Sequence, residues 1–222
     1  MIDVFPTPLL VPARRSLGIF MITKNFFKIK CYLNRSIYLV DFFKLLMEKG
    51  LVIVYTGKGK GKTTSALGIV LRAVGYRKKI GMIQFIKGSW HYGEMYSSKR
   101  LEPEFEMIAV GKGFVGILDD KSTKEEHEIV ANEALKISKE KIDSGNYDII
   151  ILDEVNYAVN LNLIKIEDVI SIIKSKPENV DLILTGNHAK PEVIEIADLV
   201  TEMKEIKHPF QKGIKAKKGI DF

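Results

Sequence analysis

Residues 51–64, LVIVYTGKGKGKTT, decide the fold of this chain. The apolar run LVIVY is mostly β-branched or aromatic and predicts a strand, and the glycines and lysines after it predict a phosphate-binding loop that opens a helix. Glycines allow backbone N–H groups to converge on one point, and the helix N-terminus adds partial positive charge. The stretch therefore predicts a binding site for a nucleoside triphosphate.

The loop supplies most of the predicted site residues. Those expected to bind the triphosphate are Gly57, Lys58, Gly59, Lys60, Gly61, Lys62, Thr63 and Thr64. Lys62 would neutralise phosphate oxygens, and the Thr63 hydroxyl would hold Mg²⁺. The loop is a variant, because the strict pattern G-x-x-x-x-G-K-[ST] has glycine where this chain has Thr56. A flexible turn without a ligand is the alternative, and the flanking strand and helix patterns argue against it.

A second motif, residues 148–154 (DIIILDE), is an apolar strand pattern that ends in two adjacent carboxylates. In P-loop proteins an aspartate in this place holds Mg²⁺, directly or through water, beside the hydroxyl of the loop. Such a strand also occurs by chance, so the loop upstream is what makes the motif specific. We expect Thr63, Asp153 and Glu154 to form a metal site for Mg²⁺, or for Mn²⁺ in its place.

The other patterns complete an α/β fold with a mostly parallel sheet flanked by helices. Further strands are predicted at 79–86, 105–110, 180–184 and 199–206, and helices at 63–74, from a Ser122/Glu125 capping box to about Gly145, at 162–175 and from Pro191. Candidate ligand-binding residues lie at the end of the strand at 79–86 and in the loop after it, which would face a ligand: Gln84, Lys87, Gly88, Trp90, Gly93 and Glu94.

Composition limits the class of protein. The 222 residues suit one α/β domain with an extension, and 46% apolar residues suffice for a core. The net charge of +6 suits nucleic acid and a triphosphate alike. The single cysteine, Cys31, excludes an internal disulfide, so we expect a cytoplasmic protein. No apolar run approaches the ~18 residues of a membrane span.

Residues 1–46 differ from the rest, because they are basic, contain few acidic residues and carry prolines in their first part. A targeting peptide and an extension without a fixed fold both remain open, and Met47 would serve as another start of the chain. We expect residues 47–222 to form the P-loop domain.

Four separated stretches together resemble one family. They are TGKGKGKTT (56–64), QFIKGSWHYGE (84–94), ILDEVNYAVN (151–160) and the closing run LTGNHAKPEVIEIADLVTEMKEIKHPFQKGIKAKKGIDF (184–222). In order and spacing they are similar to the P-loop type of ATP:cob(I)alamin adenosyltransferase, over residues 51–222. The resemblance implies a dimeric, RecA-like α/β protein that transfers the 5′-deoxyadenosyl group of ATP to Co(I) of a reduced corrinoid and releases tripolyphosphate.

The resemblance also implies roles for single residues. Lys62, Thr63 and Glu154 are the expected catalytic residues. Phe114 matches one of two aromatic residues of the family's corrinoid-facing loop, and Gly116 stands at the position of the other. Co(I) is a strong nucleophile that needs no general base, so the protein contributes positioning and stabilisation of the leaving triphosphate. A second copy of the chain and an electron-donating reductase are the implied partners, without nucleic acid or membrane.

Two other functions remain open at this point. A P-loop kinase or phosphohydrolase would use the same motifs to cleave ATP at the γ-phosphate and would yield ADP. A RecA-like nucleic-acid ATPase would use the basic run from Lys207, although the chain lacks the interleaved aromatic and basic residues that stack bases.

Overall fold

The computed structural model describes residues 49–87, 92–111, 113 and 122–222, all of which belong to one compact unit, Leu45–Phe222. Its strands all pair in parallel and form a single sheet in the order β3-β2-β4-β5-β1-β6. Their bounds are β1 (Val52–Thr56), β2 (Ile80–Gln84), β3 (Phe105–Ala109), β4 (Ile149–Asp153), β5 (Asp181–Thr185) and β6 (Leu199–Glu202). The predicted α/β fold with a parallel sheet is confirmed.

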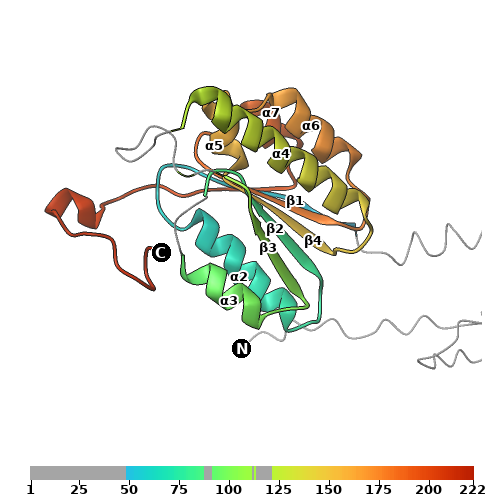
Figure 1. The fold of residues 1–222 in the computed structure, drawn as a ribbon, viewed down its shortest axis with the longest axis horizontal. Coiled ribbons are helices and arrows are strands. Elements are labelled where there is room, and N and C mark those ends of the chain that lie inside the picture. The colour runs from blue at the N-terminus through green and yellow to red at the C-terminus, as the bar shows by residue number, and fades with distance from the viewer. Residues whose placement is uncertain (1–48, 88–91, 112, 114–121) are drawn as a thin grey trace, which may run out of the picture. The chain divides into compact units, whose positions relative to one another are not determined.

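Helices cover both faces of this sheet (Figure 1). One face carries α2 (Lys62–Val74) and α3 (Gly93–Arg100), and the other carries α4 (Lys124–Asp143), α5 (Val155–Asn160), α6 (Ile166–Ser175) and α7 (Pro191–Ile196). A 3₁₀ turn, η1 (Pro209–Lys212), follows β6. None of the helices in the described ranges is long and apolar enough to cross a membrane.

Each face of the sheet has its own apolar core. In β4, Ile149 and Ile151 pack with α2, whereas Ile150 and Leu152 pack with the helices of the opposite face. Successive side chains of a strand point to opposite faces, so a strand covered on both sides is apolar throughout. This is why β2 and β4 are buried along their whole length, as their sequences predict.

The strand order positions the site. The carboxyl ends of parallel strands meet at one edge of the sheet, which is where ligands of α/β proteins bind. β5 pairs with both β1 and β4, so it separates the strand that leads into the P-loop from the strand that ends in Asp153. This strand order brings both sequence motifs to the same edge.

The predicted elements are present, but several end elsewhere than expected. β6 stops at Glu202 rather than at residue 206, because its partner β1 pairs with it only up to Thr56 and then turns into the P-loop. The helix expected at 162–175 begins only at Ile166. The sequence analysis does not predict α5, which begins directly after β4 because Glu154 adopts a left-handed backbone conformation.

The capping box of α4 lies one residue later than predicted. Thr123 Oγ1 accepts a hydrogen bond from the Glu126 N–H at 3.2 Å, and Glu126 Oε2 accepts one from the Thr123 N–H at 3.0 Å. The prediction of Ser122 and Glu125 is wrong, because the run STKEE contains both pairs at the same spacing. Only the position of the helix distinguishes them.

Candidate active site

The P-loop joins β1 to α2 and departs from the strict pattern without strain. Gly57 and Gly61 have φ angles of +95° and +113°, which favour glycine. Thr56, at the departing position, is the buried last residue of β1, and its Oγ1 accepts a hydrogen bond from the Ala189 N–H at 3.1 Å. The loop therefore begins at Gly57, as predicted.

The segment that follows β6 packs against the P-loop. The Gly59 N–H donates to the Met203 carbonyl oxygen at 2.7 Å. A Cβ on Gly57 would lie 2.5 Å from that oxygen, and a Cβ on Gly59 would lie 2.8 Å from it. The glycines are thus needed for this close packing as well as for the turn. Sequence reasoning missed the role of Met203, because nothing in the local pattern links it to the loop.

Lys62 folds back onto the loop that precedes it. Its Nζ donates to the carbonyl oxygens of Gly57 at 2.8 Å and of Gly59 at 2.9 Å. Burial lowers the pKa of Lys62, while the negative charges of Glu154 and Asp153 act in the opposite direction. The cation is held inside the loop, where it would meet the oxygens of a bound phosphate.

Asp153 connects the two sequence motifs. Its side chain is fully buried, and its Oδ1 accepts hydrogen bonds from the hydroxyls of Thr63 and Thr185, each at 2.8 Å. Oδ2 accepts one from Gln84 Nε2 at 3.0 Å and lies 3.5 Å from Lys87 Nζ. These donors follow or end three strands other than β4, so the carboxylate is held by the fold as a whole.

Glu154 lies in an unusual backbone conformation beside Asp153. Its φ of +64° is left-handed, which costs a residue other than glycine about 1–3 kcal/mol and is typical of functional sites. The Glu154 N–H donates to Thr185 Oγ1 at 2.9 Å. Burial, together with the negative charge of Asp153, raises the pKa of Glu154 to about 7, against the opposing charges of Lys62 and Lys87.

Lys87 adds a second cation to this edge of the sheet. Its Nζ lies 3.3 Å from Glu94 Oε1, 3.5 Å from Asp153 Oδ2 and 5.1 Å from the centre of the Tyr92 ring. Burial alone would lower the pKa of Lys87, but the carboxylates of Asp153 and Glu94 raise it above its ordinary value. Lys87 therefore balances the charge of Asp153 on the side away from the P-loop.

The structure connects five of the residues predicted for the site and adds Thr185. Thr63, Asp153, Gln84, Lys87 and Glu94 form a connected set of contacts. Thr185 was not predicted as a site residue, although its position at the carboxyl end of a buried strand could have indicated it. The predictions for Gly88, Trp90, Phe114, Gly116 and residues 1–46 lie outside the described residues.

The oxygen atoms of the site suit Mg²⁺. Thr63, Asp153 and Glu154 offer a hydroxyl and carboxylates, the hard donors that Mg²⁺ prefers. Gln84 Oε1 is buried and has no hydrogen-bond partner within the described part of the chain, so it is free to accept from a metal-bound water. The described residues contain no group of three or more His, Cys, Asp or Glu that could hold a metal ion. An ion held by Thr63, Asp153 and Glu154 would also take phosphate oxygens and water as ligands.

A parallel sheet, a glycine loop at its carboxyl edge, and a lysine, a threonine and carboxylates around that loop define a P-loop nucleotide-binding protein. A family model described as ATP:corrinoid adenosyltransferase BtuR/CobO/CobP matches residues 48–222. The chain belongs to this family of ATP:corrinoid adenosyltransferases.

Curated relatives agree with this family. The chain is similar to a corrinoid adenosyltransferase of Escherichia coli (strain K12), with 37% identity over 178 residues, 79% of this chain and 87% of the relative. A corrinoid adenosyltransferase of Sinorhizobium sp is 38% identical over 177 residues, covering 79% and 81%. Among solved structures, the flagellar accessory protein FlaH from Methanocaldococcus jannaschii is 16% identical with a TM-score of 0.49, covering 77% of each chain.

Proposed function

We propose that residues 57–64 bind the whole triphosphate of ATP, so that the bond broken is the one between C5′ of the ribose and the triphosphate oxygen. As a member of its family the chain is an ATP:corrinoid adenosyltransferase, and its product belongs to the formation of adenosylcobalamin. This membership does not favour a kinase or a phosphohydrolase, which would use the same loop to cleave ATP at the γ-phosphate.

The reaction is a substitution at carbon. Co(I) of the reduced corrinoid supplies an electron pair to C5′, the C5′–O bond breaks, and tripolyphosphate leaves with the electron pair of that bond. Cobalt passes formally from Co(I) to Co(III). Because the nucleophile needs no deprotonation, the chain need not supply a general base, and its task is to orient ATP and stabilise the charge that develops on the leaving group.

In this proposal the catalytic residues are Lys62, Thr63 and Glu154. Lys62 neutralises the leaving triphosphate, since its ammonium already lies against the loop carbonyls at 2.8 and 2.9 Å. Thr63, Asp153 and Glu154 would hold Mg²⁺, which when bound supplies positive charge beside the phosphate oxygens. The hydrogen bond of 2.8 Å between the Thr63 hydroxyl and Asp153 is the single observation that carries the proposal, because it joins the loop to the carboxylates.

We further propose a homodimer in the cytoplasm, with a reductase that supplies the electrons for Co(I). Residues 47–222 would form the catalytic domain and residues 1–46 an extension, and Phe114 would face the corrinoid. The lone cysteine and the resemblance of residues 51–222 to the family support these proposals. Sedimentation of the purified full chain tests the dimer.

Product analysis tests the proposed reaction. The full chain is incubated with ATP, Mg²⁺ and chemically reduced cobalamin, and the phosphate product is separated while the cobalamin spectrum is recorded. We expect tripolyphosphate and adenosylcobalamin in equal amounts. ADP and inorganic phosphate would show that the γ-phosphate is attacked instead, and hydrolysis stimulated by added nucleic acid would favour the third function.

A further inference from the structure

The last six residues, 217–222, form what we call the C-terminal strap. Residues 209–220 are exposed to solvent, whereas Asp221 and Phe222 are partly covered. Figure 1 shows the segment after β6 running out from the sheet and turning back, so that the C-terminus lies near the start of α2. The end of the chain is therefore held against the body of the protein although the segment that leads to it is not.

The strap reaches the P-loop through one side chain. Asp221 Oδ1 accepts a hydrogen bond from Lys60 Nζ, and Asp221 Oδ2 accepts one from the Lys217 N–H at 2.8 Å. The Asp221 N–H donates in turn to the Lys217 carbonyl oxygen at 2.8 Å. The hydrogen bond from Lys60 lowers the pKa of Asp221. A closed turn thus presents an ionised carboxylate to a lysine of the phosphate-binding loop.

The strap also approaches the start of α3, the helix that follows β2 in the chain. A Cβ on Gly93, the first residue of α3, would lie 4.0 Å from the carbonyl carbon of Phe222. In the sheet, β4 and β5 lie between β1 and β2. The strap consequently links the segments after β1 and β2, on either side of the strands that end in Asp153 and Thr185.

We propose that Asp221 competes with the triphosphate for Lys60: it pairs with the Lys60 ammonium in the ligand-free enzyme and is displaced from it when a triphosphate binds. The inference rests on the proposed binding of the triphosphate by the P-loop, and it does not depend on which bond of ATP is broken.

Displacement is favourable for two physical reasons. The side chains of Lys60 and Asp221 are 52% and 20% exposed, and exposed ion pairs of this kind are weak. A triphosphate carries more negative charge than one carboxylate and also accepts hydrogen bonds from the loop backbone. Because residues 209–220 are exposed, little packed surface is lost when the strap moves.

Removal of the charge of Asp221 tests this inference. The affinity of full-length Asp221→Asn for ATP and for inorganic tripolyphosphate is measured by calorimetry with Mg²⁺ and without corrinoid. We expect both ligands to bind roughly two- to fivefold more tightly than to the wild type, since the competing ion pair is lost. The difference should vanish near ~1 M salt, where the Debye length is about 3 Å. In the transfer assay KM for ATP falls while kcat stays constant.

Matched variants show whether the effect passes through Lys60. Asp143→Asn removes the same charge from the last turn of α4, where Asp143 pairs with Lys139 at 3.5 Å, and we expect it to leave both affinities unchanged. In a Lys60→Gln background, Asp221→Asn is expected to have no further effect.

Weaker or unchanged binding of ATP and tripolyphosphate by Asp221→Asn would overturn the inference. So would an increase in affinity that is the same in the wild-type and Lys60→Gln backgrounds. If wild type and variant show the expected difference but ATP is converted to ADP, the inference stands and the proposed reaction fails. If tripolyphosphate is the product but the affinities do not differ, the reaction stands and the inference fails.

Discussion

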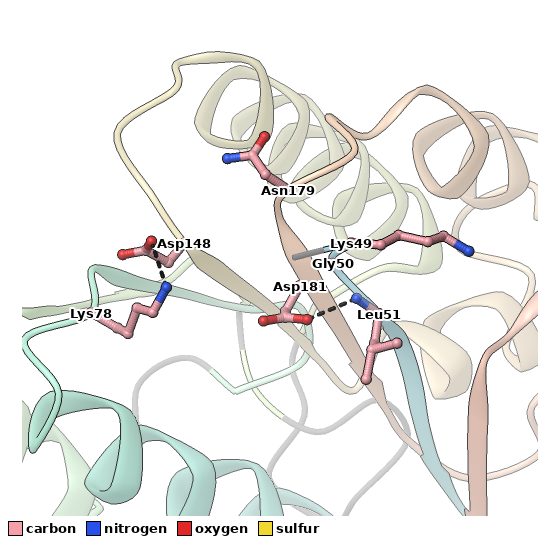
Figure 2. Close-up of a pocket in the computed structure, with 7 residues that line it drawn as sticks. All are labelled: Lys49, Gly50, Leu51, Lys78, Asp148, Asn179 and Asp181. Atoms are coloured by element: carbon pink, nitrogen blue, oxygen red, sulfur yellow. Dashed lines mark hydrogen bonds and ion pairs between the residues drawn. The ribbon is translucent and has the colours of Figure 1, made fainter. Parts of the chain in front are cut away.

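Two cavities among the described residues lie at different places, and the larger of the two is not at the predicted site. A cavity of about 440 Å³ lies where strands begin and is lined by Lys49, Gly50, Leu51, Lys78, Asp148, Asn179 and Asp181 (Figure 2). A cavity of about 330 Å³ lies beside the P-loop, between Gly59 and Lys60 and the segment 204–209. Both contain lysine and carboxylate side chains, so the presence of charged groups does not identify the functional cavity, and the larger size does not either.

The carboxylates of the two regions differ in the groups that they bind. In the larger cavity, Asp181 accepts the Leu51 N–H at 2.7 Å, and Asp148 accepts the Lys79 N–H at 2.8 Å and Lys78 Nζ at 3.2 Å (Figure 2 shows the Asp181–Leu51 and Asp148–Lys78 pairs). These carboxylates satisfy backbone groups where strands begin. The Asp153 carboxylate instead is fully buried, and its hydrogen-bond partners among the described residues are the side chains of Thr63, Gln84 and Thr185. A buried charge that no local backbone group requires is the better sign of a functional site.

The strongest test of this contrast compares a lysine from each edge. Lys62→Ala is expected to reduce adenosyl transfer by ~2–5 kcal/mol in kcat/KM, because the leaving triphosphate loses a charged partner. Lys78→Ala, which removes the exposed pair with Asp148, is its control and is expected to change transfer by less than about threefold. Steady-state kinetics with chemically reduced cobalamin measure kcat/KM of both variants. Comparable losses of kcat/KM would mean that the P-loop and the larger cavity do not differ in their importance for the reaction.

The second test uses the pKa of Glu154. Because this pKa is raised from 4.5 to about 7, the native state keeps a proton between these pH values that the unfolded state has lost. The free energy of unfolding of the wild type therefore falls as pH rises through this window. Glu154→Gln cannot ionise and is expected to be more stable than the wild type by up to ~3 kcal/mol at pH 8, with a smaller difference at pH 5.

Urea unfolding of the ligand-free protein at both pH values measures this difference. Glu133→Gln, on the exposed side of α4, is the control and is expected to show no such dependence on pH. If the difference in the free energy of unfolding between wild type and Glu154→Gln is the same at pH 5 and pH 8, the raised pKa of the Glu154 carboxyl is disproved.

The third test compares two left-handed glycines. Gly57→Ala would place a Cβ 2.5 Å from the Met203 carbonyl oxygen, whereas Gly145, with φ of +70°, has no atom within 4 Å of such a Cβ. We expect Gly145→Ala to cost about 1 kcal/mol of stability for its backbone alone, and Gly57→Ala to cost about 2 kcal/mol or more and to weaken ATP binding. Thermal unfolding with and without ATP measures both effects, and equal losses would mean that the packing against Met203 is unimportant.

The smallest effect is expected at the larger cavity itself. Asp181→Ala leaves the Leu51 N–H without its acceptor and is expected to cost about 1 kcal/mol of stability, with kcat and KM unchanged. Chemical unfolding and the transfer assay measure the two effects separately. A clear loss of transfer in a folded Asp181→Ala protein would mean that this cavity also serves the reaction.

Sequence reasoning reached the parts of the site that local chemistry encodes. Glycine at positions 57 and 61, the lysine and threonine after them, and an apolar strand before two carboxylates each leave a pattern within a few residues. It failed at Thr123 and Glu126, where two capping boxes have the same spacing, and at α5, whose start depends on one left-handed residue. Such choices depend on packing, which short patterns do not record.

The sequence alone determined that a strand, a phosphate loop and a helix follow one another, because side-chain period and glycine placement act over neighbouring residues. Only the tertiary structure decided that Thr63 bonds to Asp153, 90 residues away, and that Asp221 meets Lys60, 161 residues away. Contacts of this length depend on the order of the strands in the sheet and on the path of the chain after β6. The physical reason is that parallel strands bring their carboxyl ends to a common edge whatever their distance along the chain.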